Sequence, residues 1–148
     1  MGHTGGMKIE DALAYARPIR RGTLATLKSD GRPQLSNILF TVGGDGLVRI
    51  SGTATRAKTA NMLRDPRVSL HVTAPDFWSY VVLEADAELT PVASDPDDAT
   101  VDELVEYYRD LQGEHPDWQE YRAAMVADER MVARLRPTRC YGSVPESG

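Results

Sequence analysis

Hydrophobic and polar residues recur with different periods along the chain, and each change of period marks an expected element. Ile9, Leu13 and Ala16 have the spacing of one helix face, and Pro18 ends that pattern. From residue 22 onward the apolar residues fall in short runs separated by turn residues, which is typical of strands. The pattern therefore predicts a short amphipathic helix followed by β-structure.

A polar turn divides the first β-segment, residues 22–42, into two strands. Ser29, Asp30 and Gly31 form this turn, because an Asp-Gly pair tolerates the positive φ of a tight hairpin. The spacing of apolar residues, the capping residues and the prolines identify the remaining strands and helices in the same way. They predict strands at residues 47–51, 67–74, 79–92 and 130–143, the last interrupted at Pro137, and helices within residues 56–64, 95–113 and 115–126, the second capped by Asp97 or Asp98.

The order of these elements indicates the fold class. They follow one another as helix, three strands, helix, two strands, two helices and strand, so the strands cluster instead of alternating with helices. This order favours an antiparallel barrel or sheet with peripheral helices over a doubly wound parallel sheet. The expected fold is mainly β with peripheral helices (α+β), as a single domain over residues 8–148. Residues 1–7 are expected to be a disordered leader or a cloning remnant.

Composition narrows the class of protein further. Of the 148 residues, 41% are hydrophobic and 26% are charged, as in a globular domain, and the net charge of -5 argues against a general nucleic-acid binder. Cys140 is the single cysteine, so the chain has no internal disulfide or cysteine metal site and fits a cytoplasmic location. No apolar stretch approaches the roughly 20 residues that cross a bilayer. We therefore expect neither nucleic acid nor a membrane as partner.

Motifs of several enzyme classes are missing from the sequence. The three histidines, His3, His71 and His115, lie far apart, and none has the spacing of metal ligands. The sequence contains no nucleophile elbow, no Walker motif and no dinucleotide fingerprint. No metal site and no catalytic residue can be assigned, and anion recognition remains as the chemistry to consider.

The segment SGTATRAKTANML, residues 51–63, concentrates positive charge where a helix already carries it. Arg56 and Lys58 fall in the first turn of the expected helix, where the backbone supplies about half a positive charge. With Gly52, the hydroxyl of Thr53 and the free N–H groups, they have the chemistry of a phosphate site. Alternatively, both cations are solvated surface residues that lose a few tenths of a kcal/mol to the dipole. The residues alone leave both interpretations open.

Two further groups of residues have the chemistry to contact a planar ligand. Gln34, Ser36 and Asn37 offer amide and hydroxyl groups to a heteroaromatic ring, although the wet face of an edge strand has the same composition. Trp78 and Tyr80 are two residues apart, which places them on one side of a strand. There they either stack on a planar ligand or pack in a core or interface.

Three segments together carry a resemblance to a known family. They are GTLATLKSDGRPQLSNILF, RAKTANMLRDPRVSLHV and WSYVVLEADAEL. They closely resemble the FMN-binding split-barrel superfamily, which includes pyridoxamine 5'-phosphate oxidase, and within it the actinobacterial group that uses the deazaflavin coenzyme F420. The resemblance extends roughly from Ile19 to Gly142. Its most specific part is RAKTANMLRDPR, in which a basic R-x-K pair precedes an N-x-x-x-DPR helix.

The resemblance implies a fold, an assembly and a site. The implied fold is a six-stranded antiparallel split β-barrel that works as a homodimer, with a cofactor site at each end of the subunit interface. Arg56 and Lys58 are then expected to hold the cofactor phosphate, and Trp78 and Tyr80 to reach the site from the other subunit. The full set of implied cofactor-binding residues is Gln34, Leu35, Ser36, Asn37, Ser51, Thr53, Arg56, Ala57, Lys58, Trp78 and Tyr80.

The function implied by the resemblance is that of an F420-dependent oxidoreductase. Hydride is expected to pass from the reduced deazaflavin to an electron-poor small organic acceptor, which no motif identifies. Because such a cofactor performs the chemistry, the lack of a catalytic triad is expected. Two alternatives remain open: an FMN-dependent oxidase or reductase on the same barrel, and a carrier that binds F420 or a flavin without turnover.

Overall fold

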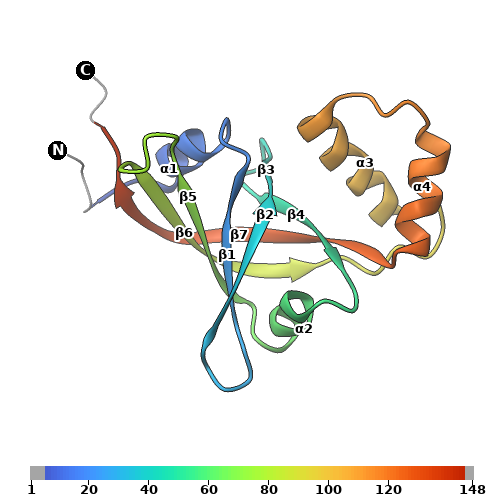
Figure 1. Ribbon diagram of the computed structural model, residues 1–148, viewed down its shortest axis with the longest axis horizontal. Helices are drawn as coiled ribbons and strands as arrows, with labels where there is room; N and C mark the ends of the chain where they lie inside the picture. Colours follow the sequence, from blue (N-terminus) through green and yellow to red (C-terminus); the bar gives the residue numbers. More distant parts are fainter. Residues whose placement is uncertain (1–5, 146–148) are drawn as a thin grey trace.

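A strongly curved antiparallel sheet forms the body of the protein, with helices at its edges and at one end (Figure 1). The computed structural model describes residues 6–145. The helices in this range are α1 (Ile9–Ala16), α2 (Ala57–Arg64), α3 (Ala99–Gln112) and α4 (Trp118–Ala127). The strands are β1 (Arg21–Leu27), β2 (Pro33–Leu39), β3 (Thr41–Val42), β4 (Val48–Thr53), β5 (Arg67–Thr73), β6 (Tyr80–Leu89) and β7 (Arg130–Ser143).

All neighbouring strands pair antiparallel, in the order β2-β1-β5-β6-β7-β4-β3, which confirms the predicted mainly β fold class with its peripheral helices. The helix caps also follow the sequence. Asp98, and not Asp97, caps α3, because its carboxylate accepts a hydrogen bond from the N–H of Val101 at 2.8 Å. The expected irregularity at Pro137 is present as a shift of register between β6 and β7.

The described sheet has seven strands, which corrects the predicted six. β2 ends at Leu39, and after a single residue β3 begins and pairs with β4 instead of β1. β2 and β3 stand at opposite ends of the strand order, so this step brings the two edges of the sheet together. Phe40, at the step, is fully buried. Apolar alternation continues through it to Val42, which is why the pattern predicted one strand where the structure has two.

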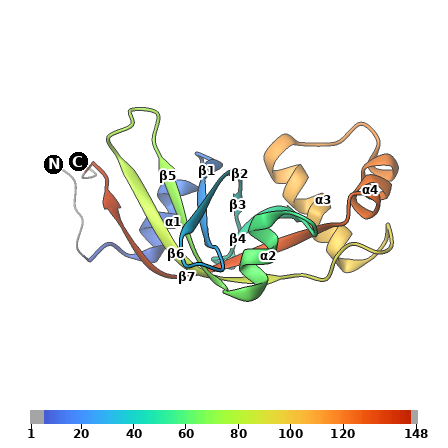
Figure 2. The same ribbon diagram turned by 60° about the horizontal axis from the view of Figure 1, so that its bottom comes forward.

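The inner face of the sheet forms the main core. Leu24, Leu70 and Leu83 are almost completely buried there, and α1 and α2 pack against the same core. A second, smaller core around Leu104, Tyr121 and its neighbours joins α3 and α4 to the start of β7. This helix pair stands at the opposite end of the sheet from α1 (Figures 1 and 2).

The described residues include the end of the predicted leader. Met7 is partly buried against the core, and its carbonyl oxygen accepts a hydrogen bond from the Cys140 thiol at 3.2 Å. Residues 1–5 of the leader lie outside the described residues. Within residues 6–145, no helix is long and apolar enough to cross a membrane.

Candidate anion and cofactor site

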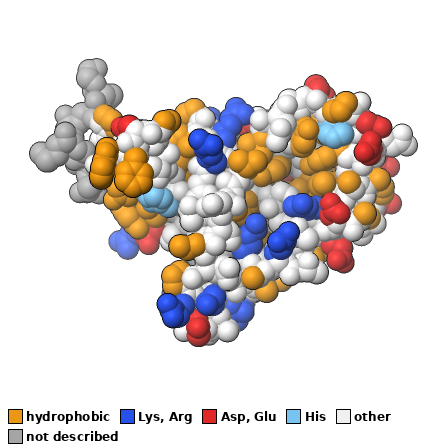
Figure 3. Space-filling view, viewed as in Figure 1, with side chains coloured by type: hydrophobic (Ala, Val, Ile, Leu, Met, Phe, Trp, Pro, Cys, Tyr) orange, Lys and Arg blue, Asp and Glu red, His pale blue; other side chains and the backbone are white. Residues whose placement is uncertain are grey.

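A cleft of about 380 Å³ lies in the split of the barrel, where β2 faces β4. More than half of the residues expected to bind a cofactor meet at this cleft. Lys and Arg side chains gather in this part of the molecule, between the β1–β2 hairpin and the α3–α4 pair (Figure 3). The lining residues are Gln34, Ser36, Thr53, Arg56, Ala57, Lys58 and Arg130.

The start of α2 forms the floor of the cleft. Arg56 is the N-cap in an extended conformation (φ −80°, ψ 150°), and its side chain makes no capping hydrogen bond. The first intrahelical bonds run from the N–H groups of Thr59 and Ala60 to the carbonyl of Arg56, at 3.1 and 3.2 Å. The N–H groups of Ala57 and Lys58 precede these bonds, so they are the free donors of the helix start. No acidic residue occupies the first turn of α2, so nothing there offsets the dipole.

Three cations line the cleft together. Arg56, Lys58 and Arg130 take part in none of the ion pairs found among residues 6–145, and no carboxylate lines the cleft. Burial lowers the pKa of the Lys58 ammonium, and the charges of Arg56 and Arg130 lower it further. The positive charge of the cleft is thus balanced by none of the residues that line it.

Arg130 carries the most direct sign of a missing partner. Its Nη1 donates to the Ser51 hydroxyl at 3.4 Å, whereas its Nε is buried with no hydrogen-bond partner. Buried donors are nearly always paired in folded proteins, and a buried unpaired donor costs free energy. Among residues 6–145 the chain supplies no acceptor for this donor.

Sequence reasoning missed Arg130, which is far from α2 along the chain. Arg130 is the first residue of β7, and it stands opposite Thr53 in the antiparallel pairing of β4 with β7. Glu129, just before it, has a left-handed φ of 53° and turns the chain from α4 into the strand. The only signal that identifies Arg130 is this strand pairing, which no local motif indicates.

The pleat of β2 divides the predicted polar segment between two faces. Gln34 and Ser36 point into the cleft, and Leu35 and Asn37 point to the opposite, outer face, because successive strand residues alternate. The Leu35 side chain is accordingly 65% exposed. The four residues therefore do not line a single surface of the chain.

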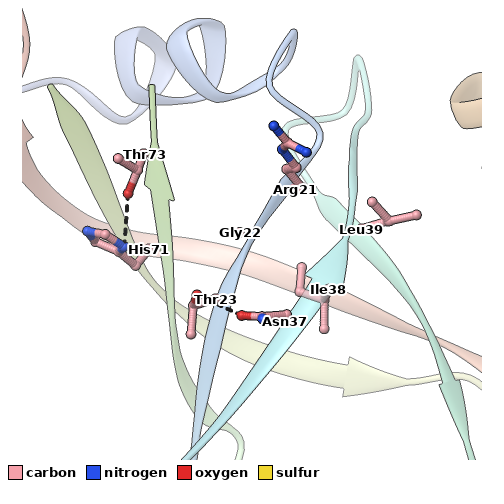
Figure 4. Close-up of a pocket in the computed structure, with 8 residues that line it drawn as sticks. All are labelled: Arg21, Gly22, Thr23, Asn37, Ile38, Leu39, His71 and Thr73. Atoms are coloured by element: carbon pink, nitrogen blue, oxygen red, sulfur yellow. Dashed lines mark hydrogen bonds between the residues drawn. The ribbon is translucent and has the colours of Figure 1, made fainter. Parts of the chain in front are cut away.

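Asn37 lies beside a second cavity, of about 440 Å³, on the outer face (Figure 4). Figure 4 shows Thr23 on β1 next to Asn37 on β2, and the Thr23 hydroxyl donates to the Asn37 side-chain oxygen at 3.2 Å. Across the cavity, His71 and Thr73 of β5 are joined by a hydrogen bond of 3.3 Å. The Tyr80 ring packs against His71 with a centroid distance of 5.3 Å. The outer face therefore gathers polar and aromatic groups of its own.

The placement of Trp78 on a strand beside Tyr80 was wrong. β6 begins at Tyr80, and Trp78 lies in the loop before it, 79% exposed. The chain turns there because the Asp76 carboxylate accepts from both the N–H and the hydroxyl of Ser79, and because Phe77 adopts a left-handed φ of 73°. Trp78 packs edge-to-face on Phe77, with 5.0 Å between ring centroids. Both rings project from the end of the sheet.

Within residues 6–145, no group of three or more His, Cys, Asp or Glu side chains is placed to hold a metal ion. The chemistry of the cleft is instead that of an anion site built from cations and helix N–H groups. The adjoining polar strand residues extend this site along the split of the barrel.

The sequence pattern of the pyridoxamine 5'-phosphate oxidase family matches residues 9–143. The chain therefore belongs to this family, which confirms the resemblance to the FMN-binding split barrels.

Solved structures share the fold over most of the chain. An F420 reductase is 27% identical, with 88% of this chain and 94% of that chain covered and a TM-score of 0.65. The conserved hypothetical protein Rv2991 from Mycobacterium tuberculosis is 22% identical, covering 96% of this chain and 91% of that chain with a TM-score of 0.71. HutZ, a heme storage protein from Vibrio cholerae, is 18% identical, covering 93% and 96% with a TM-score of 0.66. The last two likenesses concern the fold alone.

Proposed function

We propose that this protein is an F420-dependent oxidoreductase that reduces an electron-poor small organic acceptor. The observation that carries the proposal is the cleft, whose three cations have no ion-pair partner and whose buried Arg130 Nε has no acceptor within the described residues 6–145. The 27% identity to an F420 reductase supports a deazaflavin over FMN as the group whose phosphate enters this cleft.

The residues of the cleft fit a phosphate well. The Arg56 guanidinium offers a planar fork, the Lys58 ammonium a point charge, and the Arg130 Nε a donor without an acceptor. The N–H groups at the start of α2 add oriented dipoles. Gln34 and Ser36, on the facing wall, offer amide and hydroxyl groups to the polar chain that links the phosphate to the ring.

When bound, reduced F420 supplies a hydride, and the acceptor takes this hydride with one proton to become a product reduced by two electrons. The protein contributes binding, orientation and charge. No residue of the cleft has the chemistry of a committed general acid, so we assign the proton to solvent. This division of roles agrees with the absence of a catalytic triad in the sequence.

We also propose that the outer face of the sheet joins two copies of the chain. Leu35, Leu39 and Tyr141 are 65%, 46% and 45% exposed on this face, and Phe77 and Trp78 project at its end. Such a concentration of exposed apolar side chains is typical of an interaction surface. Figure 3 shows hydrophobic side chains and a group of Lys and Arg side chains on the same side of the molecule. In the proposed dimer, Asn37, Trp78 and Tyr80 of one copy contribute to the cofactor site of the other.

Fluorescence titration of the purified protein with F420, beside FMN, tests the cofactor. We expect F420 to bind more tightly. Arg56→Ala combined with Lys58→Ala should weaken F420 binding by more than about a hundredfold, because each charged hydrogen bond contributes roughly 1.5–3 kcal/mol. Lys28→Ala with Arg32→Ala is the matched control, since it removes two exposed cations at the hairpin turn. Equal affinity of both double variants would refute the phosphate assignment.

Turnover is tested by stopped-flow oxidation of bound, reduced F420 with a panel of quinones and enones. An acceptor-dependent rate is expected for at least one compound. If no acceptor changes the rate at which bound, reduced F420 is oxidised, the carrier is favoured. If the titration shows that FMN binds more tightly than F420, the flavin enzyme is favoured.

A further inference from the structure

Helix α2 is attached by hydrogen bonds to both sides of the cleft. On one side, the Thr59 hydroxyl donates to the carbonyl of Thr53 in β4 at 2.8 Å. On the other, the Asn61 side-chain amide donates to the hydroxyl of Thr26 in β1 at 3.1 Å. Thr26, Thr59 and Asn61 are 1%, 0% and 6% exposed. The Asn61–Thr26 bond is buried and the Thr59–Thr53 bond is partly buried, and together they hold α2 at defined distances from two different strands.

Both attachments end at the walls of the cleft. Thr53 lines the cleft itself, and Thr26 is the strand partner of Gln34, which lines the opposite wall. Arg64 extends the second attachment, because its Nη2 donates to the Asn61 side-chain oxygen at 2.7 Å and to the Leu27 carbonyl at 3.0 Å. The helix thus connects the β4 wall to the β1–β2 wall directly beneath the anion site.

The start of α2 needs firm attachment because the cleft that it lines is charged. Arg56 and Lys58 at the start of α2 and Arg130 on β7 repel one another, and the pKa of Lys58 is lowered by burial first and by this repulsion second. Apolar packing is non-directional and resists sliding poorly, whereas hydrogen bonds of 2.8–3.1 Å restrict both distance and direction.

We infer that Asn61 and Thr59 are positioning residues: they make α2 a brace that sets the width of the cleft and thereby its affinity for phosphate. This inference rests only on the anion-binding part of the proposed function and needs neither F420 nor turnover. It also explains the asparagine of the N-x-x-x-DPR segment, whose side chain hydrogen-bonds to Thr26 and Arg64. If the bonds merely satisfied buried polar groups, breaking them would lower stability without changing affinity.

The test compares two buried threonines. Thr26→Val removes the acceptor of Asn61 at nearly constant shape, and Thr26→Ser retains the hydroxyl. Thr100→Val is the matched control, because the Thr100 hydroxyl donates to the Pro91 carbonyl at 2.8 Å and is 5% exposed, away from the cleft. Inorganic phosphate is titrated into each full-length protein, and the amide resonances of Ala57 and Lys58 report binding. Denaturant unfolding measures stability in parallel.

Thr26→Val should weaken phosphate binding about three- to tenfold, whereas Thr26→Ser and Thr100→Val should bind within about twofold of the parent. Thr26→Val and Thr100→Val should lose comparable stability. Equal phosphate affinity in all variants would overturn the brace. If Thr26→Val does not fold, Arg64→Met, which releases Asn61 from its exposed side, should weaken binding in the same direction, and unchanged affinity would overturn the inference.

The outcome also separates this inference from the proposed function. A parent protein that binds no phosphate would overturn the anion site and the brace together. A parent that binds phosphate with the expected variant pattern, yet binds no F420, would support the brace and refute the reductase.

Discussion

Replacing Arg130 with methionine should make the protein more stable when its cleft is empty and less able to bind phosphate. The buried Nε of Arg130 has no acceptor, and such a donor costs roughly 1–3 kcal/mol. The hydrogen bond to Ser51 is long, at 3.4 Å, so its loss costs at most about 1 kcal/mol. Removing one of three mutually repelling cations adds a further gain. We therefore expect Arg130→Met to raise the free energy of unfolding by about 1 kcal/mol.

With phosphate present the order should reverse. A guanidinium bound to phosphate contributes roughly 1.5–3 kcal/mol, so Arg130→Met should bind phosphate about ten- to a hundredfold more weakly. At a phosphate concentration of about a hundred times the parent's Kd, binding stabilises the parent by about 2.7 kcal/mol. About half of this stabilisation should be missing in the variant if its affinity falls tenfold, and most of it if the affinity falls a hundredfold.

Denaturant unfolding with and without phosphate measures both effects in one assay. Arg136→Met is the control, since Arg136 is an exposed residue of the same strand outside the cleft, and it should change stability by less than about 0.5 kcal/mol. Loss of more than 1 kcal/mol from the empty Arg130→Met protein, or phosphate affinity equal to the parent's, would refute the reasoning.

Three further predictions concern an ion cluster, the proposed interface and pH. Glu103 of α3 accepts from Arg49 at 2.8 Å and from Arg134 at 2.9 Å, so Glu103→Gln should cost about 2 kcal/mol of unfolding free energy at pH 7. Arg134 and then Arg49 lower the pKa of the Glu103 carboxyl below 4.5. The stability that this carboxylate contributes is therefore present above pH 4.5 and disappears as pH falls through the lowered pKa. A difference in unfolding free energy between parent and Glu103→Gln that does not change with pH would contradict this assignment. Leu35→Glu should shift the protein toward monomer in sedimentation velocity, and a monomeric parent would contradict the proposed dimer. The pKa of Lys58 is lowered, so as pH rises from that pKa to 10.5 the folded protein loses the Lys58 proton before the unfolded chain does. Over this range the stability of the empty protein should rise and its affinity for phosphate should fall. Calorimetry should find neither change in Lys58→Met.

Local sequence determined the elements of this protein and one half of its site. The carboxylate of Asp98 and the proline after Asp65 act within a few residues, so the ends of α3 and α2 could be predicted from them. Arg56 and Lys58 are adjacent to the helix start whose N–H groups they accompany, so their shared role was also visible from sequence. The antiparallel class followed from the clustering of strands, each of which needs only its own period of two.

Tertiary structure decided the rest. Arg130 joins the cleft because β7 pairs with β4, and strand pairing brings together residues that no local pattern relates. At Phe40 the chain passes from pairing with β1 to pairing with β4, although the apolar alternation is the same for one strand or two. Alternation separates Gln34 from Leu35, but only the packed core determines which of them faces inward. Local preferences act over a few residues, whereas the cleft is formed by backbone pairing and core packing between segments distant along the chain.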